Sequence, residues 1–204
     1  MVDQQEDDFY NTVEQENYAE YKDRGSKFLT YLFPIQTTDD FKKHLAKLKS
    51  EHPKANHHCF AYRLGLNNNN YRASDDGEPS GTAGKPILGQ IDSKKITNVL
   101  IVVVRYFGGT LLGVPGLINA YKLSASMVLQ TTPIVRKPIL KEIKIEFDYT
   151  NMNSVMQIVK QSNAEILSQE AALFCSMHLG IPKVMYEVTL NRLKDIYGVI
   201  VKGE

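Results

Sequence analysis

The pattern of apolar and polar positions in the first part of the chain predicts strands interleaved with helices. Residues 28–33 form an aromatic-rich run that ends at Pro34, which is typical of a β-strand. A helix is expected next, because a threonine that can cap it precedes two acids and then apolar residues at helical spacing. The candidate caps are Thr37 and Thr38, and the apolar positions are Phe41, Leu45 and Leu48.

The apolar run at residues 99–104 predicts the central strand of a sheet. This run lacks the alternation of a half-exposed strand, so we expect helices to cover both of its faces. A further strand is expected at residues 57–66. The helix that follows the glycine-rich loop should hold Pro115 in its first turn and extend to Leu129, with small residues that permit close packing on the sheet.

A segment with two prolines and no periodicity, residues 131–138, predicts a domain boundary. The residues beyond it have the order βαββα with a last strand at 199–202, which is typical of a ferredoxin-like sandwich. The expected elements are a strand with Ile143, Ile145 and Phe147 on one face, a helix at 150–161, strands at 166–172 and 174–179, and a final helix from Pro182 that includes Tyr197 and ends at Gly198.

The 204 residues are enough for two small domains after an acidic start. Residues 1–20 hold seven acids and no lysine or arginine, and we expect a mobile extension with some helix there. We therefore predict an N-terminal domain at residues 21–135 and a C-terminal domain at residues 136–204. The formal net charge is only +1, although the lysines between residues 42 and 49 form either a basic binding surface or an ordinary solvated helix face.

The composition indicates a soluble globular protein of the cytoplasm. No stretch approaches the roughly 20 apolar residues of a membrane span, and the N-terminus lacks the pattern of a signal peptide. The two cysteines, Cys59 and Cys175, have no CxxC pairing and are most simply free thiols in a reducing compartment. We therefore expect no membrane partner.

The first loop with candidate chemistry carries three carboxylates within four residues, Asp75, Asp76 and Glu78. Hard oxygen ligands of this kind suit a divalent cation, but aspartates also bond to nearby backbone N–H groups and form turns. Contacts with a partner are a third interpretation. The residues that follow open a helix whose free N–H groups would point at an anion; they are Ser80, Gly81, Thr82 and Gly84, and Lys85 comes next.

The second loop follows the predicted central strand and begins with Arg105 and Tyr106, before Gly108 and Gly109. A glycine loop between a strand and a helix suits a phosphate, although this one lacks the GK[ST] ending of a P-loop and the GxGxxG spacing of a dinucleotide site. The glycines would otherwise serve tight turns and close backbone approach. Arg105 suits a bidentate contact with phosphate or carboxylate, or an ion pair with an acid of the first loop.

The sequence His57-His58-Cys59 offers further candidate ligands. Neighbouring residues of a strand point to opposite faces, so His57 and Cys59 can share a zinc site or a nucleophile–base pair that His58 does not join. No second pair of ligands at metal spacing accompanies them. Packing in the core or at the surface is the default interpretation.

Three blocks resemble the YigZ/IMPACT family: HHCFAYRLG at 57–65, SDDGEPSGTAGKPIL at 74–88 and VVRYFGGTLLG at 103–113. The resemblance implies an α+β protein, with an N-terminal domain of the ribosomal-protein-S5-domain-2-like fold shared with domain IV of elongation factor G. It implies a small ferredoxin-like C-terminal domain similar to domain V of that factor. Eukaryotic relatives carry an additional RWD domain and regulate a kinase that controls translation initiation. The sequence Gly113-Val114-Pro115-Gly116 departs from the GTGG of relatives, which argues against a phosphate-binding loop.

Three functions follow from these patterns. The favoured one is a translation-related regulatory protein that binds the ribosome, RNA or a protein partner in translation. The alternatives are an enzyme or binder that acts on a small phosphorylated ligand, and a protein–protein adaptor. No metal or particular cofactor is indicated, and the residues expected to bind are Asp75, Asp76, Glu78, Ser80, Thr82, Lys85, Arg105, Tyr106, Gly108 and Gly109.

Overall fold

The computed structural model describes residues 8–66, 69–171 and 174–202. The chain divides into two compact units, one consisting of Tyr10–Arg136 and the other of Lys137–Glu204 with Met1–Phe9. Both units combine helices with antiparallel sheets, so the predicted α+β class is confirmed. Among the described residues, no helix is long and apolar enough to cross a membrane.

The N-terminal unit is built on a five-stranded antiparallel sheet in which β6 lies at the centre, as predicted. Every apolar residue of the run at 99–104 is fully buried. A strand that is covered on both faces needs no polar positions, which is why this run lacks alternation. The strand order is β2 (Asn17–Asp23), β3 (Ser26–Pro34), β6 (Val99–Tyr106), β4 (His57–Arg63) and β5 (Tyr71–Ser74).

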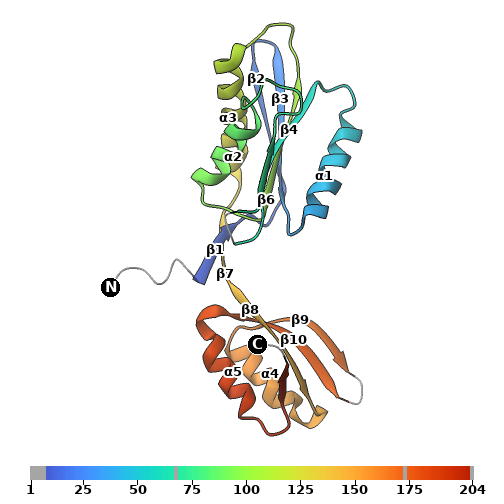
Figure 1. Ribbon diagram of the computed structural model, residues 1–204, viewed down its shortest axis with the longest axis vertical. Helices are drawn as coiled ribbons and strands as arrows, with labels where there is room; N and C mark the ends of the chain where they lie inside the picture. Colours follow the sequence, from blue (N-terminus) through green and yellow to red (C-terminus); the bar gives the residue numbers. More distant parts are fainter. Residues whose placement is uncertain (1–7, 67–68, 172–173, 203–204) are drawn as a thin grey trace, which may run out of the picture. The chain divides into compact units, whose positions relative to one another are not determined.

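Helices cover the two faces of this sheet unequally (Figure 1). One face packs against α1 (Thr38–Glu51), and the other packs against α2 (Gly84–Ser93) and α3 (Gly113–Thr131). Because successive side chains of β6 point to opposite faces, Val103 joins the core under α2 and α3, whereas Val104 joins the core under α1. The sheet therefore separates two hydrophobic cores.

The start of α1 has the predicted cap. The Thr37 hydroxyl accepts a hydrogen bond from the Asp40 backbone N–H at 3.1 Å, and the Asp40 carboxylate accepts one from the Thr37 N–H at 2.9 Å. This reciprocal capping box satisfies two backbone donors that the helix itself leaves without partners. Pro115 likewise lies in the first turn of α3, as predicted.

The expectation of a mobile, partly helical extension at residues 1–20 is wrong for the described part of that segment. Residues 9–12 form β1 (Phe9–Thr12), which pairs with β7 (Val135–Pro138), and β2 is an edge strand paired with β3 along its whole length. Ala19 and Tyr21 pack against the core, while Glu20 and Lys22 alternate with them along the strand. Apolar and charged residues thus alternate as in a strand with one buried face. The sequence interpretation gave more weight to the excess of acids than to this alternation.

The C-terminal unit has the predicted ferredoxin-like order, including the last strand. Ile143, Ile145 and Phe147 lie in one core with apolar residues of the helices α4 and α5. The prediction that the final helix includes Tyr197 is wrong. The helix ends at Lys194, and Tyr197 is 99% exposed. The elements are β8 (Leu140–Phe147), η2 (Tyr149–Asn151), α4 (Met152–Gln161), β9 (Glu165–Ala171), β10 (Cys175–Pro182), η3 (Lys183–Met185), α5 (Tyr186–Lys194) and β11 (Ile200–Lys202).

Candidate functional site

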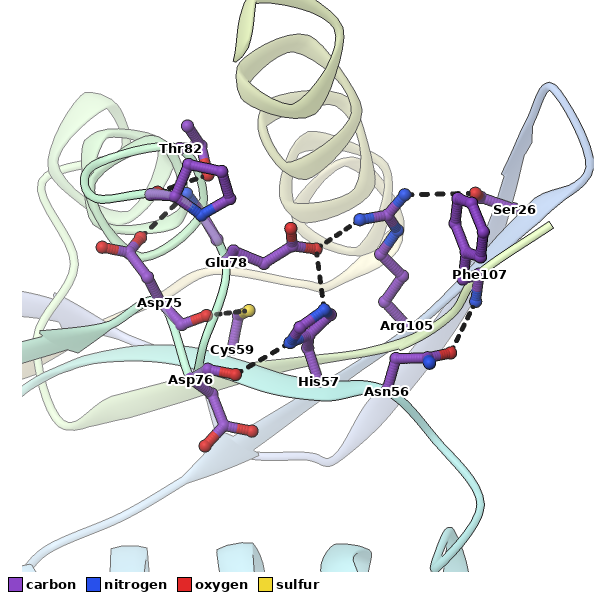
Figure 2. A network of polar contacts seen from close by, with 12 residues as sticks. Ser26, Asn56, His57, Cys59, Asp75, Asp76, Glu78, Thr82, Arg105 and Phe107 are labelled. Carbon is purple, nitrogen blue, oxygen red and sulfur yellow. Dashed lines mark hydrogen bonds and ion pairs between the residues drawn. The ribbon is translucent and has the colours of Figure 1, made fainter. Parts of the chain in front are cut away.

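Strand register brings the candidate groups of the N-terminal unit together at one end of the sheet. His57 at the start of β4 lies directly opposite Arg105 near the end of β6, and Phe28 of β3 lies opposite Arg105 on its other side. The acid loop leaves β5 and turns back over this end, because Asp76 and Gly77 adopt positive φ angles of 43° and 91°. Figure 2 shows Glu78 from this loop between the side chains of His57 and Arg105.

Arg105 forms a buried ion pair with Glu78. Its Nη1 lies 2.5 Å from Glu78 Oε1, and the two side chains are 6% and 4% exposed. The Tyr121 hydroxyl donates to the same carboxylate oxygen at 2.7 Å, and the guanidinium carbon lies 5.4 Å from the centre of the Phe28 ring. Arg105 was considered either as a contact for a bound phosphate or carboxylate or as the ion-pair partner of a loop acid. The structure shows the ion pair, and the charge of Arg105 is therefore already neutralised by Glu78.

Asp75 occupies the N-terminal end of α2. Its carboxylate accepts backbone hydrogen bonds from Gly81, Ala83 and Gly84 at 2.8, 2.9 and 2.8 Å. Burial by itself raises the pKa of Asp75, but these N–H donors together with Lys85 outweigh it and hold the pKa below the ordinary range. The anion expected at this helix start is thus the chain's own carboxylate.

Replacing Asp75 by asparagine is expected to lower the free energy of unfolding at pH 7 by about 1–3 kcal/mol, because charge-assisted hydrogen bonds are lost. The folded-state pKa lies below that of the unfolded chain, so this contribution is present above about pH 5 and is lost as the pH falls through the folded value. Urea unfolding at pH 7 and pH 3 should therefore show a gap between wild type and Asp75→Asn that closes in acid. A gap that is equal at both pH values would contradict this role.

His57 has one ring nitrogen fixed by the backbone. Its Nδ1 lies 2.8 Å from the Asp76 carbonyl oxygen, and since a carbonyl only accepts, Nδ1 must carry the proton. The other nitrogen, Nε2, faces Glu78 Oε1 at 3.8 Å. The free ring nitrogen of His57 therefore faces the carboxylate.

The Cys59 thiol is buried and contacts the Asp75 carbonyl oxygen at 3.0 Å and the Tyr121 hydroxyl at 3.3 Å. Burial raises the pKa of Cys59 far above its usual value, so the thiol stays protonated, which does not suit a nucleophile. Within the described ranges, no three His, Cys, Asp or Glu side chains are arranged to hold a metal ion.

A pocket of about 460 Å³ opens beside the ion pair. Its polar side is formed by Asn56, His57, Glu78 and Arg105. The other lining residues are mostly apolar and come from the segment between β6 and α3 and from the start of α3; they are Pro79, Phe107, Leu111, Leu112, Gly113, Val114 and Leu117. The pocket thus joins a neutralised polar floor to apolar walls.

Comparison with known proteins places the chain in a family. Residues 24–129 match the family model described as the Impact N-terminal domain. An IMPACT family member from Haemophilus influenzae is 36% identical over 177 residues, which are 84% of this chain and 84% of that protein. This chain belongs to the IMPACT family.

The likeness to other IMPACT proteins extends through both units. The IMPACT family member YigZ of Escherichia coli is 33% identical over 174 residues, which cover 84% of this chain and 85% of YigZ. The crystal structure of a protein described only as hypothetical is 27% identical, with a TM-score of 0.76, and the match covers 97% of this chain and 98% of that one.

Several residues expected to bind do not line the pocket of this IMPACT protein. Ser80, Lys85 and Gly109 are exposed, while the Thr82 hydroxyl is buried and donates to the Pro79 carbonyl oxygen at 2.7 Å. Tyr106 points to the face opposite Arg105, where its hydroxyl lies 2.9 Å from His52 Nδ1. Their part in binding, and that of Gly108, stays a prediction.

The sequence interpretation missed the apolar part of the pocket. Leu111 and Leu112 follow the glycines, and Val114 lies in the first turn of α3. Leu111 is 82% exposed, Val114 51% and Phe107 44%. Large apolar residues in and directly after a short loop between a strand and a helix were the available signal, because such a loop is ordinarily polar.

The lysines of α1 form a partly neutralised face. Lys42 pairs with Asp39 at 2.9 Å, Lys47 lies 3.9 Å from Glu51, and Lys49 lies 3.6 Å from Asp76. Exposed pairs of this kind contribute little to stability, but they reduce the positive potential of the helix. The solvated helix face is therefore the better interpretation of this run.

Proposed function

We propose that this IMPACT protein is a translation-related regulatory protein that binds the ribosome, or a protein working on it, through the apolar rim of the pocket. The apolar rim consists of Phe107, Leu111 and Val114. The family resemblance implies the link to translation, and the surface supports binding by apolar contact. The observation that carries the proposal is the exposure of these three large side chains around one pocket.

The apolar rim has the properties of a contact surface. Contiguous exposed apolar groups on a soluble protein commonly mark interaction sites, and burying one such side chain contributes about 1.5–3 kcal/mol. The charged groups beside the rim are satisfied within the chain, since Arg105 binds Glu78 and Asp75 binds the start of α2. Contacts to phosphate therefore have less support here than apolar contacts do.

Co-sedimentation with ribosomes of the host organism across a salt series tests this proposal. The wild-type protein should sediment with ribosomes and should still do so as salt rises, because apolar contacts are not screened. Leu111→Asp should weaken association by about tenfold or more, since it buries a charge in place of a leucine. Leu66→Asp is the matched control, because Leu66 is 47% exposed in the same unit but does not line the pocket.

Two outcomes would count against the proposal. A protein that stays in the supernatant at low salt does not bind ribosomes. A steep loss of binding with salt, equal in wild type and Leu111→Asp, indicates phosphate contacts by basic side chains elsewhere on the protein.

The alternative of an enzyme or binder for a small phosphorylated ligand has weaker support. The pocket has a suitable size, since small-molecule sites commonly measure about 300–1,000 Å³. However, the arginine that would take the phosphate is neutralised by Glu78, and the start of α2 holds Asp75. A phosphate in this pocket would meet the Glu78 carboxylate beside an arginine that is already paired.

A further inference from the structure

We propose that the pocket is a binding site for an organic ammonium, an R–NH₃⁺ group on an apolar stem, held between Glu78 and His57. This inference concerns the ligand chemistry of the pocket. It goes beyond the proposed function and does not depend on ribosome association.

The Glu78 carboxylate has an unused acceptor. All of its side-chain contacts with described residues, to Arg105, Tyr121 and His57, involve Oε1. Figure 2 shows the contacts with Arg105 and His57. Oε2 makes none of these contacts, and the Glu78 side chain lines the pocket. A hydrogen-bond donor on a ligand in the pocket can therefore bind Oε2 without displacing Arg105 or Tyr121.

His57 adds a second acceptor beside the first. Its Nδ1–H is committed to the Asp76 carbonyl, and Nε2 lies 3.8 Å from Glu78 Oε1. A ligand donor that enters between these two atoms contacts both of them. A nitrogen roughly 2.8 Å from both atoms spans an angle of about 85° between them, which two N–H bonds of one ammonium can approach.

The carboxylate in the pocket favours a cationic head group over an anionic one. Glu78 lines the pocket, whereas Asp75 is bound by the start of α2 and Asp76 lies 3.6 Å from Lys49. An anionic head group would meet Glu78 with Arg105 already paired to it, whereas an ammonium is attracted to the carboxylate. The walls from Leu112, Val114 and their neighbours fit an aliphatic or aromatic stem rather than a second polar group.

Two sources can supply this one chemistry. A free amine of metabolite size fits the volume of the pocket, and so does the N-terminal residue of a peptide with an apolar side chain. Both place an ammonium at Glu78 and an apolar group against the walls. Binding measurements with both kinds of probe distinguish them.

The test uses n-pentylamine, with 1-pentanol and pentanoate as probes of the same shape and different charge. Each is titrated into the ¹⁵N-labelled full-length protein, and the backbone amide signals of residues around the pocket are followed. We expect saturable shifts with the amine at pH 7.5 and binding at least about tenfold weaker for the alcohol and the acid. A peptide with a free N-terminal leucine and its acetylated form test the second source.

Variants assign the binding to named groups. Glu78→Gln should abolish the preference for amine over alcohol. Since that change also breaks the buried ion pair, His57→Leu is the second variant and should weaken amine binding by about tenfold or more. His44→Leu is its control, because His44 stacks on Phe33 under α1, away from the pocket.

Equal binding of amine, alcohol and acid, or shifts that His57→Leu leaves unchanged, would overturn the inference. If n-pentylamine binds, a free amine with an apolar stem is enough to occupy the pocket. If only the peptide with a free N-terminus binds, the ligand is the N-terminus of a protein or peptide. Ribosome co-sedimentation of the same samples is measured separately. Loss of amine binding with intact ribosome association would remove this inference and leave the proposed function standing.

Discussion

Replacing Arg105 by alanine is expected to lower the free energy of unfolding by about 3–5 kcal/mol. The change removes the partner of Glu78, whose side chain is 4% exposed, and leaves a buried carboxylate with the Tyr121 hydroxyl as its remaining close donor. Uncompensated buried charges are among the few causes of such large losses. Urea or thermal unfolding, with circular dichroism as the signal, measures the effect.

A matched control shows whether the expected loss comes from the buried ion pair or would follow the removal of any positively charged side chain. Lys27 pairs with Glu20 at 3.2 Å, but those side chains are 43% and 31% exposed. Lys27→Ala should therefore cost less than about 1 kcal/mol. The double variant Arg105→Met/Glu78→Leu should recover much of the loss, because an apolar pair leaves no charge behind. An Arg105→Ala protein as stable as wild type would show that the ion pair is not formed.

Replacing Gly108 by alanine is expected to lower the free energy of unfolding by at least about 3 kcal/mol, beyond the usual cost of an overpacked side chain. The chain of Gly108 passes directly over the turn between β2 and β3. A Cβ atom at Gly108 would lie 1.9 Å from the Gly25 carbonyl carbon and 2.2 Å from the Ser26 nitrogen. These are backbone atoms that have no rotamer to change, so the loop or the turn must move. Chemical denaturation checks the size of the loss.

Gly89 is the control for this prediction. It lies inside α2, and a Cβ atom there would have nothing within 4 Å. Gly89→Ala should raise the free energy of unfolding by about 0.5–1 kcal/mol, because alanine has less conformational entropy to lose in a helix. If Gly108→Ala and Gly89→Ala had similar effects, the close approach of the two backbones would be disproved.

Elements with a strong local pattern were predictable from the sequence. The continuous apolar run of β6 required burial on both faces, and the start of α1 was indicated by a capping threonine, Thr37 or Thr38, followed by two acids. In the C-terminal unit, the change from alternating to helical periodicity indicated each strand and helix in order. Each of these signals acts over a few residues and needs no knowledge of distant partners.

Elements that depend on distant partners were not predictable in the same way. β2 is stable because Ala19 and Tyr21 pack on a core supplied largely by residues far along the chain, and its acids suggested an extension without strands. Tyr197 has the spacing of a helix, but the helix ends at Lys194, and Gly198 takes a positive φ angle of 84° shortly after. Helical spacing alone does not fix where a helix ends.

The sequence by itself determined the family, the α+β class and the two loops that carry the candidate chemistry. The tertiary structure alone decided how those groups are used. The register of β4 on β6 sets His57 opposite Arg105, and the turn at Asp76 brings Glu78 onto the arginine. The sequence shows which charged side chains are present, but their burial and the distances between them decide which pairs neutralise one another. That is why an expected phosphate contact became a neutral ion pair beside an apolar pocket.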